Sequence, residues 1–141
     1  MSAPPHCEVG QLRVFAETDE IAGLSLAGEF DMANAPQIIE EGERLLADDN
    51  QVIVDLGDAT FIDASVIHAL VRVGAEARKD GRVVVLQLGT AAIVERVIEI
   101  SNIERVLPRA RTRAEAIDTI RQLRPPAENP ITSLLRVSSG S

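Results

Sequence analysis

The chain has 141 residues, the usual size of one domain, and 45% of them are hydrophobic, which is enough to build a buried core. Its formal net charge is -8, whereas proteins that bind nucleic acid need clustered lysine and arginine for the phosphates. Tryptophan and tyrosine are absent and phenylalanine occurs three times, so base stacking is disfavoured. We therefore expect protein partners rather than DNA or RNA.

The sequence predicts a cytoplasmic protein without a membrane span. The first ten residues have neither a basic start nor an apolar run, and nowhere do about 18 apolar residues follow one another. The single cysteine, Cys7, has no partner within the chain for a disulfide, so nothing indicates an oxidising compartment.

The first half of the chain predicts two strands, a helix and a further strand. Residues 11–16 and 21–27 have the composition of two short strands separated by a polar segment, 17–20, which suits a hairpin. Asp31 is then expected to cap a helix whose apolar residues recur at helical spacing and which closes at 48–50. Residues 52–56 are mostly apolar and predict a buried strand.

The second half predicts alternating helices and strands. A helix is expected over 64–79, with an inner face consisting of Ile67, Leu70, Val71, Gly74 and Ala77. A buried strand over 83–88 follows, and Thr90 is the expected N-cap of the next helix.

A short edge strand is predicted over 105–107, before Pro108, and a last helix over 112–123. This order predicts an α/β fold, a small mixed sheet of four to five strands with about four helices packed on it. The domain is expected to span 11–123, between a flexible leader, 1–10, and a flexible tail containing proline and serine, 124–141.

The most informative stretch is 52–74, VIVDLGDATFIDASVIHALVRVG, in which a strand, a polar turn and an amphipathic helix follow one another. It places Asp63, Ala64 and Ser65 at the start of the helix. The first N–H groups of a helix lack intrahelical partners and carry the positive end of the helix dipole, which favours an acidic cap or a phosphate. Asp63 is therefore a candidate cap, and Ser65 a candidate phosphorylation site.

Residues for catalysis or metal binding are scarce. His6 and His68 are the two histidines, which gives neither a paired metal site nor a triad with a plausible base. Glycine-rich phosphate loops are missing as well. Asp31 and Asp63 could be viewed as a general acid and base, but both serve naturally as helix caps. We expect no enzyme, no cofactor and no metal.

Asp55-Leu56 followed by Phe61-Ile62-Asp63-Ala64-Ser65 resembles the signature of STAS domains of the anti-sigma factor antagonist type. Gly28-Glu29-Phe30-Asp31 is similar to the family's Gly-Glu-Leu-Asp turn. The resemblance implies a STAS-like fold and a regulator that binds an anti-sigma factor, a GHKL-type kinase, and so releases a sigma factor. In that family, phosphorylation of the first hydroxyl residue after the aspartate blocks binding, and a PP2C-type phosphatase restores it.

The usual turn of the family is Asp-Ser-Ser-Gly or Asp-Ser-Thr-Gly, and here Ala64 occupies the phosphorylated position. Ser65 has taken over as acceptor, or the protein binds without phosphate control, or it keeps only the scaffold. We favour the last two together, because a shift of one residue rotates the hydroxyl by about 100° around the helix. The partner face implied by the resemblance consists of Asp31, Asp63, Ala64, Ser65, Val66 and His68.

Two other functions stay open. Some STAS modules bind a nucleotide or another small molecule, or serve as a subunit of a membrane transport ATPase system. A stressosome-type scaffold is a weaker option, because such proteins carry a longer N-terminal domain than the ten residues found here. The sequence does not specify the oligomeric state, the sigma factor or the kinase.

Overall fold

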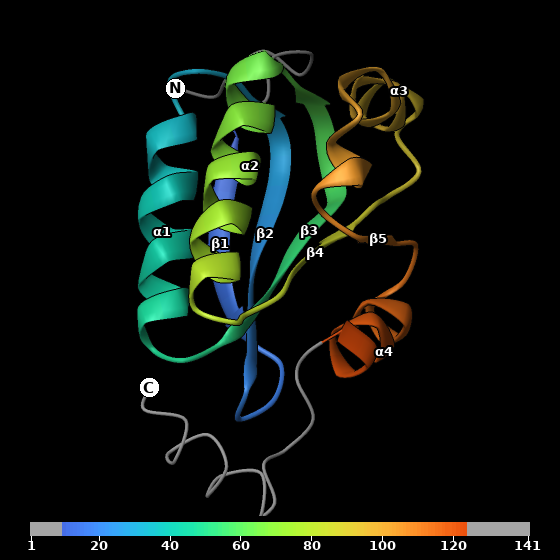
Figure 1. The fold of residues 1–141 in the computed structure, drawn as a ribbon. Coiled ribbons are helices and arrows are strands. Elements are labelled where there is room, and N and C mark those ends of the chain that lie inside the picture. Colours follow the sequence, from blue (N-terminus) through green and yellow to red (C-terminus); the bar gives the residue numbers. More distant parts are fainter. Residues whose placement is uncertain (1–9, 124–141) are drawn as a thin grey trace, which may run out of the picture.

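A computed structural model describes residues 10–123, and these form one mixed sheet with helices on both faces (Figure 1). The strands are β1 (Gln11–Ala16), β2 (Ile21–Phe30), β3 (Gln51–Ile62), β4 (Val84–Gln87) and β5 (Arg109–Ala110). The helices are α1 (Ala35–Ala47), α2 (Ala64–Lys79), α3 (Ala92–Ser101), the 3-10 helix η1 (Ile103–Arg105) and α4 (Arg113–Leu123). The predicted α/β fold with a small mixed sheet is therefore confirmed.

The strands lie side by side in the order β1-β2-β3-β4-β5. Only β1 and β2 run antiparallel, as the predicted hairpin, and the remaining neighbours are parallel. The carboxyl ends of β2, β3 and β4 thus meet at one edge of the sheet, and α1, α2 and α3 begin there. This edge carries every residue of the predicted partner face.

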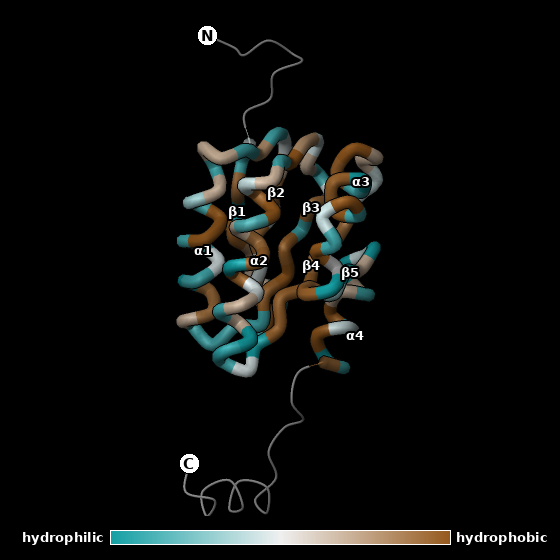
Figure 2. Tube along the Cα trace, turned by 45° about the horizontal axis from the view of Figure 1, so that its top comes forward, coloured by the Kyte–Doolittle hydropathy of each residue, from teal (hydrophilic) through white to brown (hydrophobic). Residues whose placement is uncertain are grey.

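Two apolar clusters hold the layers together. The larger one lies between the sheet and α1, α2 and α3, and the smaller one fastens α4 to the opposite face through Ile53, Val85, Ala116 and Ile120. Figure 2 shows brown, hydrophobic residues along the central strands β3 and β4, which are covered on both sides. Such two-sided burial explains their nearly continuous apolar sequence.

Strands β2 and β3 both run further than the sequence predicts. Their pairing shifts register twice, and Gly28 sits at the second shift with a φ of 88°, which favours glycine. Beyond these bulges the pairing resumes, and Phe30, predicted to lie in a turn, is fully buried. The bulges let both strands continue past the apolar segments from which the sequence predicts them.

Three further expectations are wrong. The N-cap of α1 is Asn34 rather than Asp31, and that of α3 is Ala91, which packs against the core, rather than the exposed Thr90. The last strand follows Pro108, whose carbonyl accepts a hydrogen bond from Leu86.

The segment 105–107 belongs instead to the 3-10 turn and the loop after it, because Ile103 and Leu107 are drawn into the core. The inner face of α2 is wider than expected. Four of its five expected residues are buried and Val71 is 36% exposed, while Val66, Ala69 and Val73 are buried as well, since α2 packs between α1 and α3.

A charged cluster ties α4 to the sheet. The Arg113 guanidinium donates to Gln87 at 2.7 Å, Glu17 at 2.8 Å and Asp55 at 2.6 Å, and lies 4.1 Å from the centre of the Phe15 ring. Partial burial lowers the pKa of Arg113, but the hydrogen bonds to Glu17 and Asp55 and their negative charges raise it, and the net pKa lies above the ordinary value. Arg113 therefore stays charged and fixes the start of α4. We call these five residues the Arg113 cluster.

Candidate functional site

The site lies where β2 and β3 end. Phe30 and Ile62 are paired in the parallel ladder, so the residues that follow them, Asp31 and Asp63, leave the sheet side by side. Neighbouring strands are about 4.8 Å apart. The fold therefore brings together two aspartates that are 32 positions apart in the sequence.

Asp63 is the N-cap of α2, as predicted. Its backbone is extended, with φ -115° and ψ -175°, and its carboxylate accepts a hydrogen bond from the N–H of Val66 at 3.2 Å. A negative charge at this point is stabilised by the unpaired N–H groups and by the helix dipole.

Asp31 builds a turn of its own before α1. Its carboxylate accepts from the N–H of Ala33 at 2.9 Å, and its own N–H donates to the side-chain oxygen of Asn34 at 3.1 Å. Its carbonyl also accepts from the N–H groups of Asn34 and Ala35, both at 3.1 Å. Because these bonds close a turn over residues 31–34, the helix starts later than the sequence predicts.

The remaining predicted residues occupy the first turn of α2. Ala64 is exposed, so its methyl group faces solvent. Ser65 is half-buried, and its hydroxyl forms no hydrogen bond with the described part of the chain. His68 is exposed, whereas Val66 is fully buried, which favours packing over partner contact for Val66. We use the term helix-mouth site for Asp31, Asp63, Ala64 and Ser65.

An apolar groove of about 460 Å³ begins beside this site, between α2 and α3, and the sequence reasoning missed it. It is lined mainly by Ala64, Ile67, His68 and Val71 from α2 and by Val97 and Ile100 from α3. Ile100 is 71% exposed, an unusual state for a large aliphatic side chain. The available signal was the apolar stripe of Ile93, Val97 and Ile100 on α3, which continues past the residues that the core needs.

The described residues also bear on metal binding, nucleophilic catalysis and membrane insertion. Among residues 10–123, no group of three or more histidine, cysteine, aspartate or glutamate side chains is placed to hold a metal ion. Ser65 and His68 are three residues apart on α2, yet no hydrogen bond joins them in the described structure. No helix within the described ranges is long and apolar enough to cross a membrane.

Known proteins share this architecture. The family model described as STAS domain matches residues 14–116. The chain belongs to the STAS domain family. This match covers both aspartates and the whole of α2, so the residues that carried the resemblance lie inside the domain.

Solved STAS structures agree with this fold at low sequence identity. An anti-sigma factor antagonist from Mycobacterium paratuberculosis is 21% identical over 85% of this chain and 99% of that chain, with a TM-score of 0.64. The anti-sigma factor antagonist SpoIIAA in its unphosphorylated form is 22% identical over 81% and 97%, with a TM-score of 0.65.

A STAS domain protein from Planctomyces limnophilus is 22% identical over 80% of this chain and 99% of that chain, with a TM-score of 0.66. No curated protein matches the sequence. At these identities the likeness establishes the SpoIIAA-like STAS fold, a five-stranded mixed sheet with four α-helices over the described residues.

Proposed function

We propose that this STAS domain is a non-enzymatic, cytoplasmic anti-sigma factor antagonist, which binds a GHKL-type anti-sigma kinase and so releases a sigma factor. The observation that carries the proposal is the exposed methyl group of Ala64 in the middle of an open face, with paired aspartates on one side and an apolar groove on the other. A hydrophobic patch rimmed by polar groups is typical of a protein interaction site.

Regulation by phosphate at position 64 is lost in this proposal, because alanine offers no oxygen. A structural neighbour, SpoIIAA of Bacillus, is known in a phosphorylated form as well as an unphosphorylated one. Such a phosphate adds about -1.5 to -2 charges. Without it the domain binds constitutively, and a PP2C-type phosphatase has no substrate on it unless Ser65 has become the acceptor.

The test uses the native chain and Ser65→Glu as parallel baits for affinity capture from the cells that encode the protein. We expect a GHKL-type kinase on the native bait and a loss of it on Ser65→Glu, because the half-buried carboxylate would lose its water when a partner closes over it. Ser65→Ala is the matched control and should capture as much kinase as the native chain, since its hydroxyl makes no hydrogen bond with a described residue.

The fold should tolerate Ser65→Glu, because an acidic residue in the first turn of a helix is favourable. Unchanged capture by Ser65→Glu would remove the start of α2 from the interface. A transport ATPase in place of a kinase, or excess absorbance at 260 nm from a bound nucleotide, would overturn the proposal in favour of the transport or nucleotide-binding modules.

A further inference from the structure

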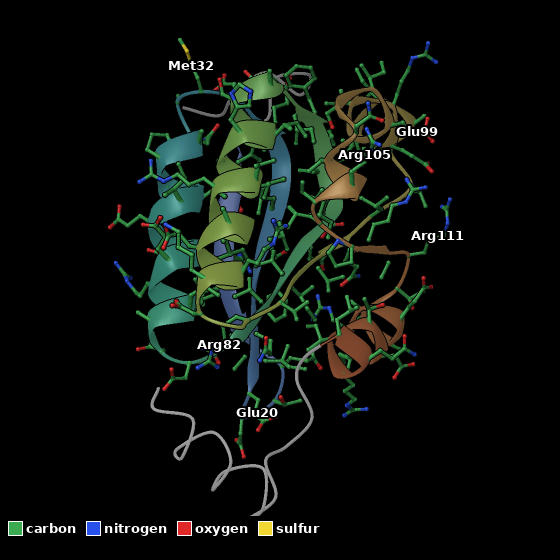
Figure 3. All side chains as sticks on the ribbon, viewed as in Figure 1. Glu20, Met32, Arg82, Glu99, Arg105 and Arg111 are labelled. Atoms are coloured by element: carbon green, nitrogen blue, oxygen red, sulfur yellow. The ribbon has the colours of Figure 1, made fainter. Side chains whose placement is uncertain are left out.

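Met32 is the most exposed large hydrophobic side chain of the described residues, at 74%. Figure 3 shows it projecting from the connection between β2 and α1, at the end of the molecule where α2 begins and away from the body of the domain. Because it is not packed into the domain, the fold gains little from a long apolar side chain at this position. A polar residue would serve such a turn equally well.

Hydrogen bonds close the turn that carries Met32. Asp31 and Asn34, on either side of it, are joined by hydrogen bonds from Asp31 N–H to the Asn34 side chain and from Asn34 N–H to the Asp31 carbonyl, both 3.1 Å long. The Asp31 carboxylate also holds the N–H of Ala33 at 2.9 Å. An apolar side chain held out on an ordered turn can bind without a large loss of backbone entropy.

Charge narrows the choice of partner. The three segments that form this end of the molecule, 28–35, 58–68 and 88–95, contain neither lysine nor arginine. Their acidic residues are Glu29, Asp31, Asp58 and Asp63, together with Glu95, which is paired with Arg111. Two copies of this face would repel each other. A protein surface with lysine or arginine around an apolar pocket would be complementary to it.

We propose that Met32 is an anchor that enters an apolar pocket on the partner protein, and that lysine or arginine side chains border this pocket and face Asp31 and Asp63. The inference rests on the proposed function and deepens it. Since α2 lies between α1 and α3 (Figure 1), the partner would span the helix-mouth site, with Met32 on one flank and the α2/α3 groove on the other. Apolar contacts at Met32 and at the groove, on either side of the charged helix-mouth site, would fix both the position and the orientation of the partner.

The experiment measures Kd by calorimetry between the full chain and each purified GHKL-type anti-sigma kinase encoded in the same genome. With the kinase that binds best, Met32→Ser should weaken binding about tenfold or more, as the loss of an anchor does. Met32→Leu keeps the apolar volume and should stay within about threefold. Both Met32 variants should have the same melting temperature as the native chain, because the side chain is exposed.

Val106→Ser is the matched control. Val106 is another exposed aliphatic residue, at 41%, and its carbonyl accepts from Arg78 in the last turn of α2, at the end remote from the helix-mouth site. This substitution should leave Kd unchanged. An equal loss with Met32→Ser and Val106→Ser would overturn the inference, because a general loss of surface hydrophobicity would then explain both.

The partner's charge is tested with Asp31→Asn, which keeps the acceptor oxygen that holds the turn. Binding of the native chain should weaken as salt rises from about 0.1 to 0.5 M, and Asp31→Asn should show a smaller salt dependence. If the native chain and Asp31→Asn had the same salt dependence, the proposed lysine or arginine residues around the partner's pocket would be overturned. If Ser65→Glu loses the kinase and Met32→Ser does not, the anchor alone fails. If no kinase binds the native chain, the proposed function fails and the anchor with it.

Discussion

Position 64 offers space for a side chain that the fold does not use. Ala64 is the first residue of α2, is exposed, and follows the Asp63 cap, so an added oxygen would meet solvent rather than the core. The proposed function assigns the lost phosphoacceptor to this position. Position 64 is therefore the direct test of whether a kinase recognises the start of α2.

We predict that Ala64→Ser is a better kinase substrate than the native chain. The new hydroxyl would stand at the position that the resemblance implies for the phosphate, about 100° around the helix from Ser65. Phosphate incorporation by the kinase found with the native bait, followed by mass spectrometry of the modified residue, checks it. Ala64→Ser in a Ser65→Ala background is the control that assigns the site. Equal incorporation into the native chain and Ala64→Ser would instead support Ser65 as the acceptor.

At the scale of elements, the sequence predicted the limits of those helices whose ends carry capping or helix-breaking residues. The limits of α2 agree with the prediction because an aspartate caps its start and Asp80-Gly81 follows its end. The ends of β2 and β3 were missed, because only pairing between distant strands decides where they stop. Thr90 had good cap chemistry, yet the packing of Ala91 against the core sets the start of α3.

Arg113 gives the clearest case of a feature without a local signal. Its partner Glu17 is 96 positions away in the sequence, and Asp55 is 58 away. An arginine in the first turn of a helix is otherwise disfavoured by the helix dipole. Glu17, Asp55 and Gln87 come together beneath α4 only when the sheet has formed. The order of the strands therefore determines the cluster, and no local sequence pattern does.

We predict that Arg113→Ala lowers the free energy of unfolding by about 2 kcal/mol, because it removes three hydrogen bonds and leaves two partly buried carboxylates unpaired. The melting temperature should fall by about 8 °C. The stability of Arg113→Lys should lie between that of the native chain and that of Arg113→Ala, since one ammonium group cannot reproduce the planar array of guanidinium donors. Circular dichroism with denaturant and heat measures both quantities.

Arg121→Ala, on an exposed position of the same helix, is the control and should change stability by less than about 0.5 kcal/mol. Because the folded pKa of Arg113 is raised, its contribution is complete at every pH below the ordinary arginine pKa, and the deficit of Arg113→Ala should be constant around neutral pH. Kinase binding should be unaffected, since the cluster lies on the sheet face opposite α1 and α2. A loss no larger than that of Arg121→Ala would contradict the role of the cluster.

At the scale of the whole molecule, the cluster that holds α4 lies apart from the proposed partner face. The α4 face is tied down by the Arg113 cluster, and the opposite end exposes Met32, Ala64 and Ile100 around paired aspartates. The sequence motifs pointed to Asp31, Asp63 and the start of α2, and the structure brings these together at one edge of the sheet. The groove and the exposed Met32 have no such motif, because exposure of an apolar side chain depends on what the tertiary structure leaves uncovered.

The extent of the apolar clusters supports a test of the predicted domain limits, 11–123. Residues 1–9 and 124–141 lie outside the described residues, whereas both apolar clusters are drawn from residues between Leu12 and Ile120. We predict that a chain of residues 10–123 folds cooperatively and melts within about 3 °C of the full chain. A chain of residues 10–111 is the control, because it lacks Arg113, Ala116 and Ile120 and uncovers Ile53 and Val85; it should lose cooperative unfolding. A fall of about 8 °C or more for 10–123 would show that the terminal residues stabilise the domain and that its limits are wider than predicted.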